Sequence, residues 1–517
     1  MSLLLALFVN LTLASEPTPD TLSIRLTAEP ETLDWNKAHT PVETHLLMNL
    51  MEGLVELDGN LRTVPALAKS WTKSPDGKKY TFHLRTDASW SDGVPVKARD
   101  FVASWKRLLS ASTGAPYAYF LFDLENAENF YAGKETDFSK VGVTALDDRT
   151  LEVRLTRPIA HWLYMPTFWV TFPIREDLVA RYGPQFTRPE KLVTTGPFTL
   201  SSHLADSKIV LKRNPYYYGK ASVTLKTVEC LIVADHSTAL SIFEAGRLDF
   251  MNDISPIDLI RLKDRPELRS FPYLKTVYLG FVTSQQAVSN PLVRQAIALA
   301  IERNGFGDLL FGGQTPGHSF VPPAMTGFDA QAGHSPRAKS ALELWTSIPV
   351  EHRPKKLTLV VPNTDKILTV AQYLQEQLRK ALKLEISILS LDHKAYQAMT
   401  ASKQEPLFLR SWSADFPDPD NFLSVFLADS GNNRTGWKSD SFDALITKAR
   451  GLPLGKARTA LFLRAQTLLV NHDTVIIPLY YEPNLALVRR RVEGLELTPL
   501  NYLFLKRVHL KGALATP

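Results

Sequence analysis

Short runs of alternating apolar and polar residues dominate the first half of the chain. Residues 80–84 (Tyr-Thr-Phe-His-Leu) and 151–155 (Leu-Glu-Val-Arg-Leu) alternate strictly, and residues 209–211 do so more weakly. A period of two places successive side chains on opposite faces of a strand. The pattern over residues 22–233 therefore predicts short strands in mixed sheets, and it makes this half strand-dominated.

The pattern changes in the second half, where strands and a helix alternate. Residues 357–361 alternate as a strand, apolar residues then recur every three or four positions from Ile367 to Leu382, and residues 384–388 alternate again. This order predicts a β-α-β unit with parallel strands. We therefore expect an α/β fold in this half, with a boundary near residue 278.

Two further helices are indicated in the second half. Residues 291–303 begin with Pro291, a residue favoured in the first turn of a helix, and continue with an apolar stripe. Residues 461–470 lead into an apolar strand at residues 475–480.

Length and composition define the class of protein. A chain of 517 residues is too long for one hydrophobic core, and 44% hydrophobic residues excludes disorder as its main state. The net charge of +6 is not concentrated in any basic run, so we expect no nucleic-acid partner. The one cysteine, Cys230, excludes an intrachain disulfide and a cysteine-based zinc site.

An apolar run over residues 3–14 precedes a polar, proline-containing segment. It is shorter than the roughly 20 residues that a membrane-spanning helix needs. Small residues at its end fit a secretory signal peptide over residues 1–15, cleaved after Ala14 or Ser15. We expect an exported, soluble protein without a lipid anchor, since no cysteine lies at the cleavage region. The alternative is a buried N-terminal strand or helix.

Catalytic signatures are absent from the sequence. There is no phosphate-binding glycine loop, no G-x-S-x-G turn and no H-E-x-x-H motif, and the twelve histidines include no pair four residues apart. We therefore expect no enzyme activity, no cofactor and no metal site.

The most unusual stretch runs from Arg410 to Phe422 and holds three aspartates among aromatic residues. Asp418 and Asp420 are interpreted as a solvated Asp-Pro turn. Asp415 lies between Ala414 and Phe416, where an unpaired charge would be costly, so it requires a cation. The ammonium group of a ligand and the side chain of Arg410 are the two candidates.

A second aromatic cluster occupies residues 116–122. Such clusters usually belong to the core. Tyr117 and Tyr119 can nevertheless direct their hydroxyls into a cleft while their rings pack.

These segments belong to a longer ordered series that resembles the peptide-binding family of extracellular solute-binding proteins, which serve ABC importers. The segment Ala115-Pro116-Tyr117-Ala118 is similar to the periplasmic oligopeptide-binding branch. The matching segments are Ala68–Trp71, Ser74–Lys78, Tyr80–Arg85, Trp90–Val96, Thr195–Phe198, Arg213–Tyr217, Val293–Ala296, Ala414–Asp415, Pro419–Phe422 and Ile477–Tyr480.

The resemblance implies a two-lobed α/β periplasmic-binding-protein fold with an additional third domain and a hinge between the lobes. Domain I would comprise residues 16–52, 176–278 and 490–517. Domain II would be 53–175 and domain III 279–489. Two strands crossing between domains I and III would form the hinge.

The resemblance also implies a ligand site. Asp415 would pair with the α-amino group of a peptide, Tyr117 and Trp412 would line the cavity, and the backbone near Ser411, Trp412 and Ser413 would bond the peptide main chain, as would that near His39, Thr40 and Pro41. Three positions depart from the family pattern. His39 replaces a glutamate, His393 replaces a tryptophan, and Arg410 lies one residue closer to the tryptophan.

The expected function is therefore capture of short peptides in the periplasm and delivery to an inner-membrane permease and ATPase complex, by a monomer. One alternative is a binder of the same fold for a cell-wall peptide, nickel chelate, haem, opine or oligosaccharide. Another is a secreted hydrolase that uses Asp415 with Asp418 or Asp420, although two intervening prolines disfavour a fixed opposed geometry.

Overall fold

The structure is a computed structural model that describes residues 20–332 and 340–511. The signal peptide expected over residues 1–15 lies outside these ranges. Across the described part of the chain, no helix has the length and apolar character needed to cross a membrane.

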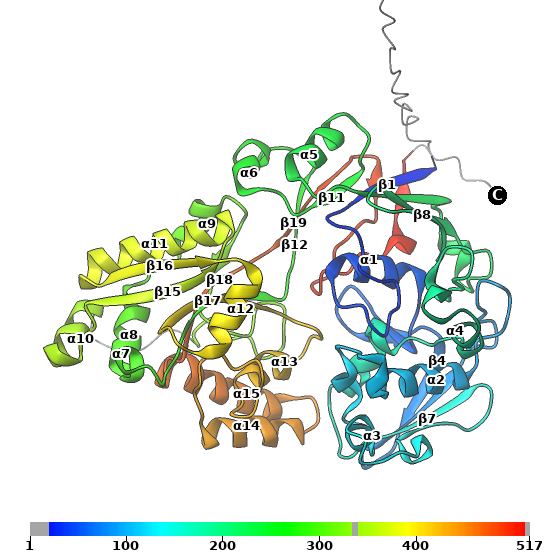
Figure 1. Ribbon diagram of the computed structural model, residues 1–517, viewed down its shortest axis with the longest axis horizontal. Coiled ribbons are helices and arrows are strands. Elements are labelled where there is room, and N and C mark those ends of the chain that lie inside the picture. The colour runs from blue at the N-terminus through cyan, green and yellow to red at the C-terminus, as the bar shows by residue number, and fades with distance from the viewer. Residues whose placement is uncertain (1–19, 333–339, 512–517) are drawn as a thin grey trace, which may run out of the picture.

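A seven-stranded mixed sheet gathers strands from the beginning, the middle and the end of the chain (Figure 1). The parallel pairs join β1 to its two neighbours, and the other pairs are antiparallel. Its order is β12 (Leu268–Phe271), β19 (Asn484–Val488), β11 (Phe250–Asn252), β1 (Thr21–Leu26), β10 (Thr227–Ile232), β9 (Lys208–Arg213) and β8 (Phe198–Leu204).

A six-stranded sheet forms the centre of the other lobe, at the left of Figure 1. Its order is β14 (Thr315–Pro316), β18 (Ile476–Tyr481), β13 (Lys275–Phe281), β17 (Leu407–Ser413), β15 (Lys356–Pro362) and β16 (Glu385–Leu391). Strands β15 and β16 are parallel and are joined by α11 (Asp365–Leu382). The predicted β-α-β unit is therefore confirmed, because burying the apolar stripe of α11 requires it to pack on the sheet.

A smaller antiparallel sheet consists of β4 (Ala68–Lys73), β5 (Lys79–Leu84), β7 (Thr150–Arg154) and β6 (Val143–Ala145). The two strictly alternating segments are its neighbouring strands β5 and β7. Tyr80, Phe82 and Leu84 are buried while the residues between them are not, as the period of two predicts. Two short antiparallel pairs, β2 (Val55–Leu57) with β3 (Thr63–Pro65) and β20 (Val492–Glu493) with β21 (His509–Leu510), complete the sheets.

Two passages connect the large sheets. The first joins β12 to β13 through residues 272–274, and the second joins β18 to β19 through Glu482 and Pro483. The Oε2 of Glu482 forms an ion pair with Lys275 Nζ at 2.7 Å, and this contact links the two passages. The expected boundary at residue 278 lies inside β13, because Lys275–Phe281 pairs with β17 along its whole length. The expected end of domain III at residue 489 also differs from the sheet boundary, because β19 (Asn484–Val488) belongs to the seven-stranded sheet.

Helices occur in both halves, so the expectation of a strand-dominated first half is incomplete. Helix α8 ends three residues before the predicted end at Arg303, whose Nε donates to Pro478 O at 3.0 Å. The helices are α1 (Pro41–Leu50), α2 (Ala98–Leu109), α3 (Ala127–Tyr131), α4 (Glu176–Tyr182), α5 (His236–Glu244), α6 (Pro256–Leu262), α7 (Gln286–Ser289), α8 (Pro291–Ala300), α9 (Gly305–Leu310), α10 (Ala341–Ser347), α12 (His393–Ser402), α13 (Pro419–Leu423), α14 (Asp440–Arg450) and α15 (Lys456–Thr467).

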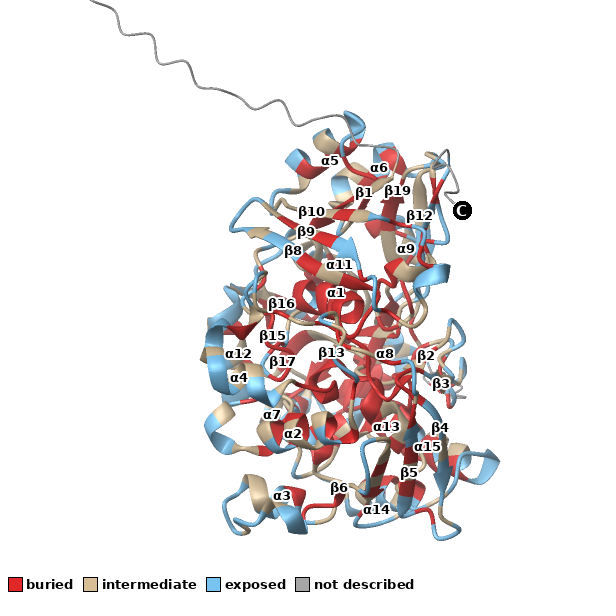
Figure 2. Ribbon diagram, turned by 90° about the vertical axis from the view of Figure 1, so that its right-hand side faces the viewer, coloured by how far each residue is buried: buried red, intermediate tan, exposed pale blue. Residues whose placement is uncertain are grey.

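Burial separates the interior helices from the surface ones (Figure 2). Helix α1 is buried from Val42 to Leu50, so it serves as a core element of its lobe. Helix α15 covers most of the predicted helix at 461–470 and continues into a π-helical turn before β18. These elements fix the positions of the segments that carry the predicted site.

Candidate functional site

The strand β17 has an open edge where the predicted main-chain contacts lie. Its pairing with β13 runs from Leu407 to Ser413, whereas its pairing with β15 stops at Phe408. Among the described residues, no other strand pairs with Ser411–Ser413 on that side. Unpaired backbone groups on a strand edge can accept an extended chain as an added strand.

Asp415 follows this strand and is held by Asn421 on α13. The Asn421 Oδ1 accepts the backbone N–H of Asp415 at 3.2 Å and the indole N–H of Trp412 at 3.1 Å, and its Nδ2 donates to Asp415 Oδ2 at 3.3 Å. Asn421 is itself buried. One amide therefore fixes both the backbone and the carboxylate of Asp415, and also the ring of Trp412.

The carboxylate of Asp415 lacks a cationic partner within the described ranges, where no Lys or Arg nitrogen lies within 4.0 Å of it. Burial raises its pKa from 3.8 to about 6, against a smaller lowering by the Asn421 hydrogen bond. Arg410, the internal candidate, lies farther back on β17, and its charge acts on another arginine, Arg434, whose pKa burial and then Arg410 lower. The site thus presents a desolvated carboxylate that a ligand cation would stabilise.

The loop after Asp415 is not the solvated turn that the sequence suggested. Asp418 is buried and makes a two-pronged ion pair with Arg458 at 2.7 and 2.8 Å, and Asp420 does the same with Arg450 at 2.7 and 3.0 Å. The arginines lie on α15 and α14, too far along the chain for local sequence to reveal the pairing. Both carboxylates are fully engaged, which argues against the acid/base pair of the hydrolase alternative.

Tyr117 begins a short 3₁₀ turn, Ala118–Leu121, in a cluster of rings. Its ring centroid lies 5.2 Å from Phe168 and 5.8 Å from Trp169, both at nearly perpendicular orientation. Burial and, next, the charge of Asp415 raise the pKa of Tyr117 to about 12. The charge of Asp415 therefore acts on the hydroxyl of Tyr117, although the two residues belong to different lobes.

Two more tyrosines share this environment. Burial and then Asp415 raise the pKa of Tyr119 and of Tyr502. The Trp169 ring lies 6.2 Å from Tyr502. Sequence reasoning missed Tyr502, because it lies in an irregular C-terminal segment without periodicity or motif.

His161 is a further contact that sequence reasoning missed. Its ring stacks on Phe416 at 5.1 Å with an interplanar angle of 10°, and its Nδ1 lies 3.3 Å from Arg458 Nη2. His161 lies in the segment that carries the four-stranded sheet, whereas Phe416 and Arg458 belong to the opposite lobe. No motif could have indicated a contact between residues nearly 300 positions apart.

The backbone N–H groups of His39 and Thr40, near which ligand contacts were predicted, already donate hydrogen bonds within the protein. Glu43 is buried, and its Oε2 accepts the backbone N–H groups of His39 at 2.7 Å and Thr40 at 2.9 Å. Thr40 caps α1 in return. This capping box arises because α1 begins with Pro41 and leaves its first N–H groups unpaired. Within residues 20–332 and 340–511, no donor bonds the carbonyl of His39, so this backbone group is available to a ligand.

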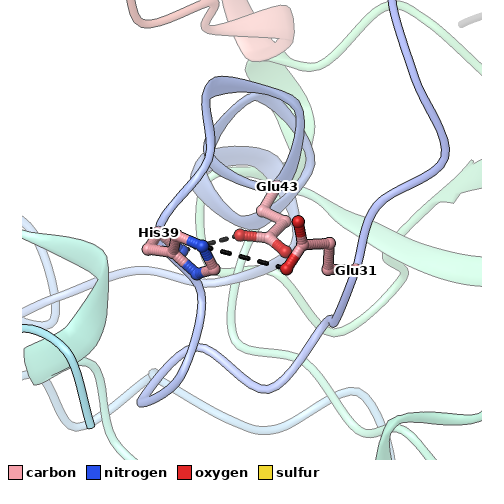
Figure 3. Close-up of side chains that lie close together, drawn as sticks. All are labelled: Glu31, His39 and Glu43. Atoms are coloured by element: carbon pink, nitrogen blue, oxygen red, sulfur yellow. Dashed lines mark hydrogen bonds and ion pairs between the residues drawn. The ribbon is translucent and has the colours of Figure 1, made fainter. Parts of the chain in front are cut away.

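Glu31, His39 and Glu43 form a small cluster (Figure 3). One ligand atom from each lies within 4.8 Å of the others, and the His39 Nε2 is 3.8 Å from Glu31 Oε2. The oxygens of Glu43 already accept three backbone N–H groups. The arrangement is therefore that of a helix cap with an exposed ion pair.

His393, another predicted site residue, is exposed at the first position of α12. Among the described residues, no hydrogen bond or ion pair joins its ring to Asp415, Trp412 or Tyr117. The structure thus brings Asp415, Trp412 and Tyr117 into one region, with Ser411 and Ser413 on the adjoining strand edge, and leaves His393 outside it.

Comparisons with known proteins give matches over most of the chain. Residues 62–434 match the family model described as bacterial extracellular solute-binding proteins, family 5. The chain is 30% identical to the probable deoxycholate-binding periplasmic protein YgiS of Escherichia coli over 94% of this chain and 92% of that protein. It is also 30% identical to the periplasmic oligopeptide-binding protein OppA of Salmonella typhimurium, over 93% and 91%. The unliganded open form of the murein tripeptide binding protein MppA superposes with a TM-score of 0.82 at 27% identity, over 96% and 98%.

Proposed function

This chain belongs to the family 5 bacterial extracellular solute-binding proteins, and we propose that it captures short peptides and delivers them to an ABC importer. The observation that carries the proposal is the pairing of an uncompensated carboxylate, Asp415, with the open edge of β17 directly before it. Together they offer one anchor for an ammonium group and one for an extended main chain.

A binder of many peptides must recognise what all peptides share. The edge at Ser411–Ser413 can pair with a peptide backbone whatever its side chains are, as in strand addition. Asp415 can fix the amino terminus, because an ammonium group left unpaired away from water would cost several kcal/mol. Tyr117 and Trp412 supply ring surface beside these anchors.

The two lobes supply different parts of the proposed site. Asp415 and Trp412 come from the lobe of the six-stranded sheet, and Tyr117 and Tyr502 come from the other lobe. We propose that the passages at residues 272–274 and at Glu482-Pro483 act as a hinge, and that ligand stabilises the closed arrangement in which both halves meet. In terms of the expected domains, the proposed site would then lie between domains I and II on one side and domain III on the other.

Export to the periplasm is part of the same proposal. The apolar run at residues 3–14 supports a cleaved signal peptide, and the named relatives are periplasmic proteins. The partners would be the permease and ATPase of an importer, and the binding protein would act as a monomer. Mass spectrometry of the protein recovered from the periplasm tests this, and an intact chain that retains Met1 would contradict it.

A double-mutant cycle on Asp415 tests the peptide site. Asp415→Asn preserves shape and removes the charge, and we expect roughly 30- to 5,000-fold weaker binding of a free peptide. Acetylating the peptide's N-terminus should weaken binding by wild type about as much. The two changes together should be less than additive, since both remove one interaction. Fully additive losses in titration calorimetry would exclude the clamp.

A bile-acid-type ligand is the second candidate, favoured by the 30% identity to a protein named for probable deoxycholate binding. The ring cluster around Tyr117 offers apolar surface for such a molecule. Deoxycholate carries a carboxylate and no ammonium group. Its binding should therefore be unharmed by Asp415→Asn, which separates the two candidates in the same calorimetric series.

A further inference from the structure

The helices α14 and α15 form a helical hairpin with a groove along its outer side. A short loop, residues 451–455, joins them, and they lie side by side at the bottom of the lobe of the six-stranded sheet (Figure 1). The α14–α15 groove has a volume of about 590 Å³. The lining residues that decide its chemistry are Leu445, Lys448, Leu461, Arg464, Leu468 and His472.

The hairpin is held firmly from its inner side. Phe442 of α14 and Phe462 of α15 are buried in the core of the lobe. Arg450 and Arg458 anchor the two helices to the segment that follows β17, through the ion pairs with Asp420 and Asp418. The groove is therefore formed before any partner arrives, which lowers the entropy cost of binding.

Leucines from both helices give the groove an apolar surface. Leu445 and Leu468 are half-buried, and Leu461 is 8% exposed. Ser441 and Ala444 line the α14 side and are small and exposed, so another backbone can approach closely there. An apolar strip between polar rims is typical of a surface that another molecule covers.

The rims of the groove carry positive charge without negative charge to match it. Among the described residues, no aspartate or glutamate lines the groove. Lys448 and Arg464 are exposed, and in the described part of the chain neither has a carboxylate oxygen within 4.0 Å. The Nδ1 of His472 lies 2.7 Å from Asp473 Oδ1, while the other oxygen of Asp473 accepts the indole N–H of Trp437 at 2.8 Å. Lys448 and Arg464 are therefore available to an acidic partner.

A π-helical turn, Leu468–His472, shapes one part of the groove. Its end is fixed by Gln295, whose Nε2 donates to His472 O at 2.8 Å, and by Arg294, whose Nε donates to Asp473 O at 2.9 Å. Such turns are uncommon and often occur at functional sites. The extra residue in the turn changes the direction of the side chains beside it, and both Leu468 and His472 line the groove.

The shape of the groove favours a helix as its occupant. The lining positions from Ser441 to Lys448 cover two turns of α14, about 10 Å along its axis. A channel bordered by two helices accepts an amphipathic helix whose apolar face lies on the leucines. Carboxylates on the flanks of that helix would then face Lys448 and Arg464.

We propose that the α14–α15 groove docks an amphipathic helix of a partner protein that carries acidic residues on its flanks. The inference goes beyond the proposed function and does not depend on which ligand the protein captures. Asp415, Trp412 and Tyr117 lie outside the lining of the groove, so partner and ligand can be bound at the same time.

The test titrates the full protein with three probes, followed by fluorescence anisotropy. The first is an amphipathic peptide of about 18 residues, long enough to form a helix, with leucines on one face and glutamates on its flanks. The second has lysines in place of the glutamates, and the third is a vesicle containing phosphatidylglycerol. We expect the acidic peptide to bind wild type roughly tenfold more tightly than the basic peptide. Added salt should reduce this preference, because exposed charges are screened.

Charge reversal in the groove is the decisive variant. In the double variant Lys448→Glu with Arg464→Glu, the acidic peptide should bind roughly 10- to 30-fold more weakly and the basic peptide more tightly than to wild type. A purely structural role would weaken both peptides alike. The matched control is Lys456→Glu, which changes an exposed lysine of α15 that does not line the groove, and it should bind both peptides as wild type does.

The other outcomes overturn the inference. No binding of the acidic peptide by wild type, equal affinity for both peptides, or no effect of charge reversal would exclude an acidic helix. Binding of the vesicle alone would assign the groove to a lipid surface. Dimerisation of wild type that charge reversal abolishes, measured by analytical ultracentrifugation, would assign it to a second copy of the chain.

Calorimetry with a short free peptide separates this inference from the proposed function. The charge-reversed protein should bind that ligand as wild type does, since neither substituted residue lies at the proposed peptide site. If no short peptide binds while the two helical probes behave as expected, the peptide function fails and the docking groove stands. If short peptides bind and the helical probes do not discriminate, the docking inference fails and the peptide function stands.

Discussion

The side chain of Asn421 holds Asp415 from both sides, accepting its backbone N–H at 3.2 Å and donating to its Oδ2 at 3.3 Å. The same amide oxygen accepts the indole N–H of Trp412. The carboxylate is therefore fixed before any ligand arrives, which lowers the entropy cost of binding.

Asn421→Ala should weaken peptide binding by less than Asp415→Asn does, since the charge remains but its orientation is lost. We expect a loss of about 5- to 20-fold, in line with the loss of one or two hydrogen bonds. Calorimetry with a free peptide measures it. The N-acetyl peptide serves as the control, and an equal loss for both peptides would contradict the orienting role.

Removing the charge of Asp415 should stabilise the ligand-free protein above pH 6. Burial raises the pKa of this carboxyl from 3.8 to about 6, so the folded state holds a proton that the unfolded state has released between these values. Wild-type stability therefore falls as pH rises through this window. At pH 8 Asp415→Asn should gain up to about 3 kcal/mol. At pH 3.5 the two proteins should unfold alike, and a variant that is less stable at pH 8 would contradict the assignment.

Peptide affinity should fall at acidic pH for the same reason. Below about pH 6 the ligand-free Asp415 is protonated and must release its proton to pair with an ammonium group. Affinity should then drop about tenfold per pH unit. Calorimetry between pH 4.5 and 8 measures the slope. Asp415→Asn supplies the control and should show a flat profile over this range.

Breaking the buried Asp418–Arg458 pair should destabilise the whole lobe. Both side chains are 3% exposed, so Arg458→Met leaves an uncompensated buried carboxylate, at a cost of about 3–5 kcal/mol in the free energy of unfolding. Replacing both partners with apolar residues should recover much of the loss. Arg379→Met, which removes an exposed ion pair of α11, is the control and should leave the unfolding midpoint unchanged.

Peptide should compact the protein. The proposed site draws Asp415 from one lobe and Tyr117 and Tyr502 from the other, so ligand favours the arrangement that brings them together. Small-angle scattering should show a smaller radius of gyration at saturating peptide. Asp415→Asn at the same peptide concentration should show little change, and an unchanged radius in saturated wild type would count against closure.

The local pattern was sufficient to identify individual elements. The period of two at residues 80–84 and the stripe on α11 predicted β5 and the β-α-β unit correctly, because both depend on spacing within one segment. The series of motifs also indicated the family, which the comparisons bear out. The ligand roles of Asp415, Tyr117 and His393 remain predictions.

The sequence by itself established the α/β character, the family and the unusual setting of Asp415. Only the tertiary structure decided which partners the charges have: Asp418 and Asp420 are paired with Arg458 and Arg450, while Asp415, Arg410 and Arg434 are left without opposite charges in the described chain. These pairings join segments 30 to 40 residues apart on different elements. Charge compensation depends on distances of a few ångströms in space, and no spacing along the chain encodes those distances.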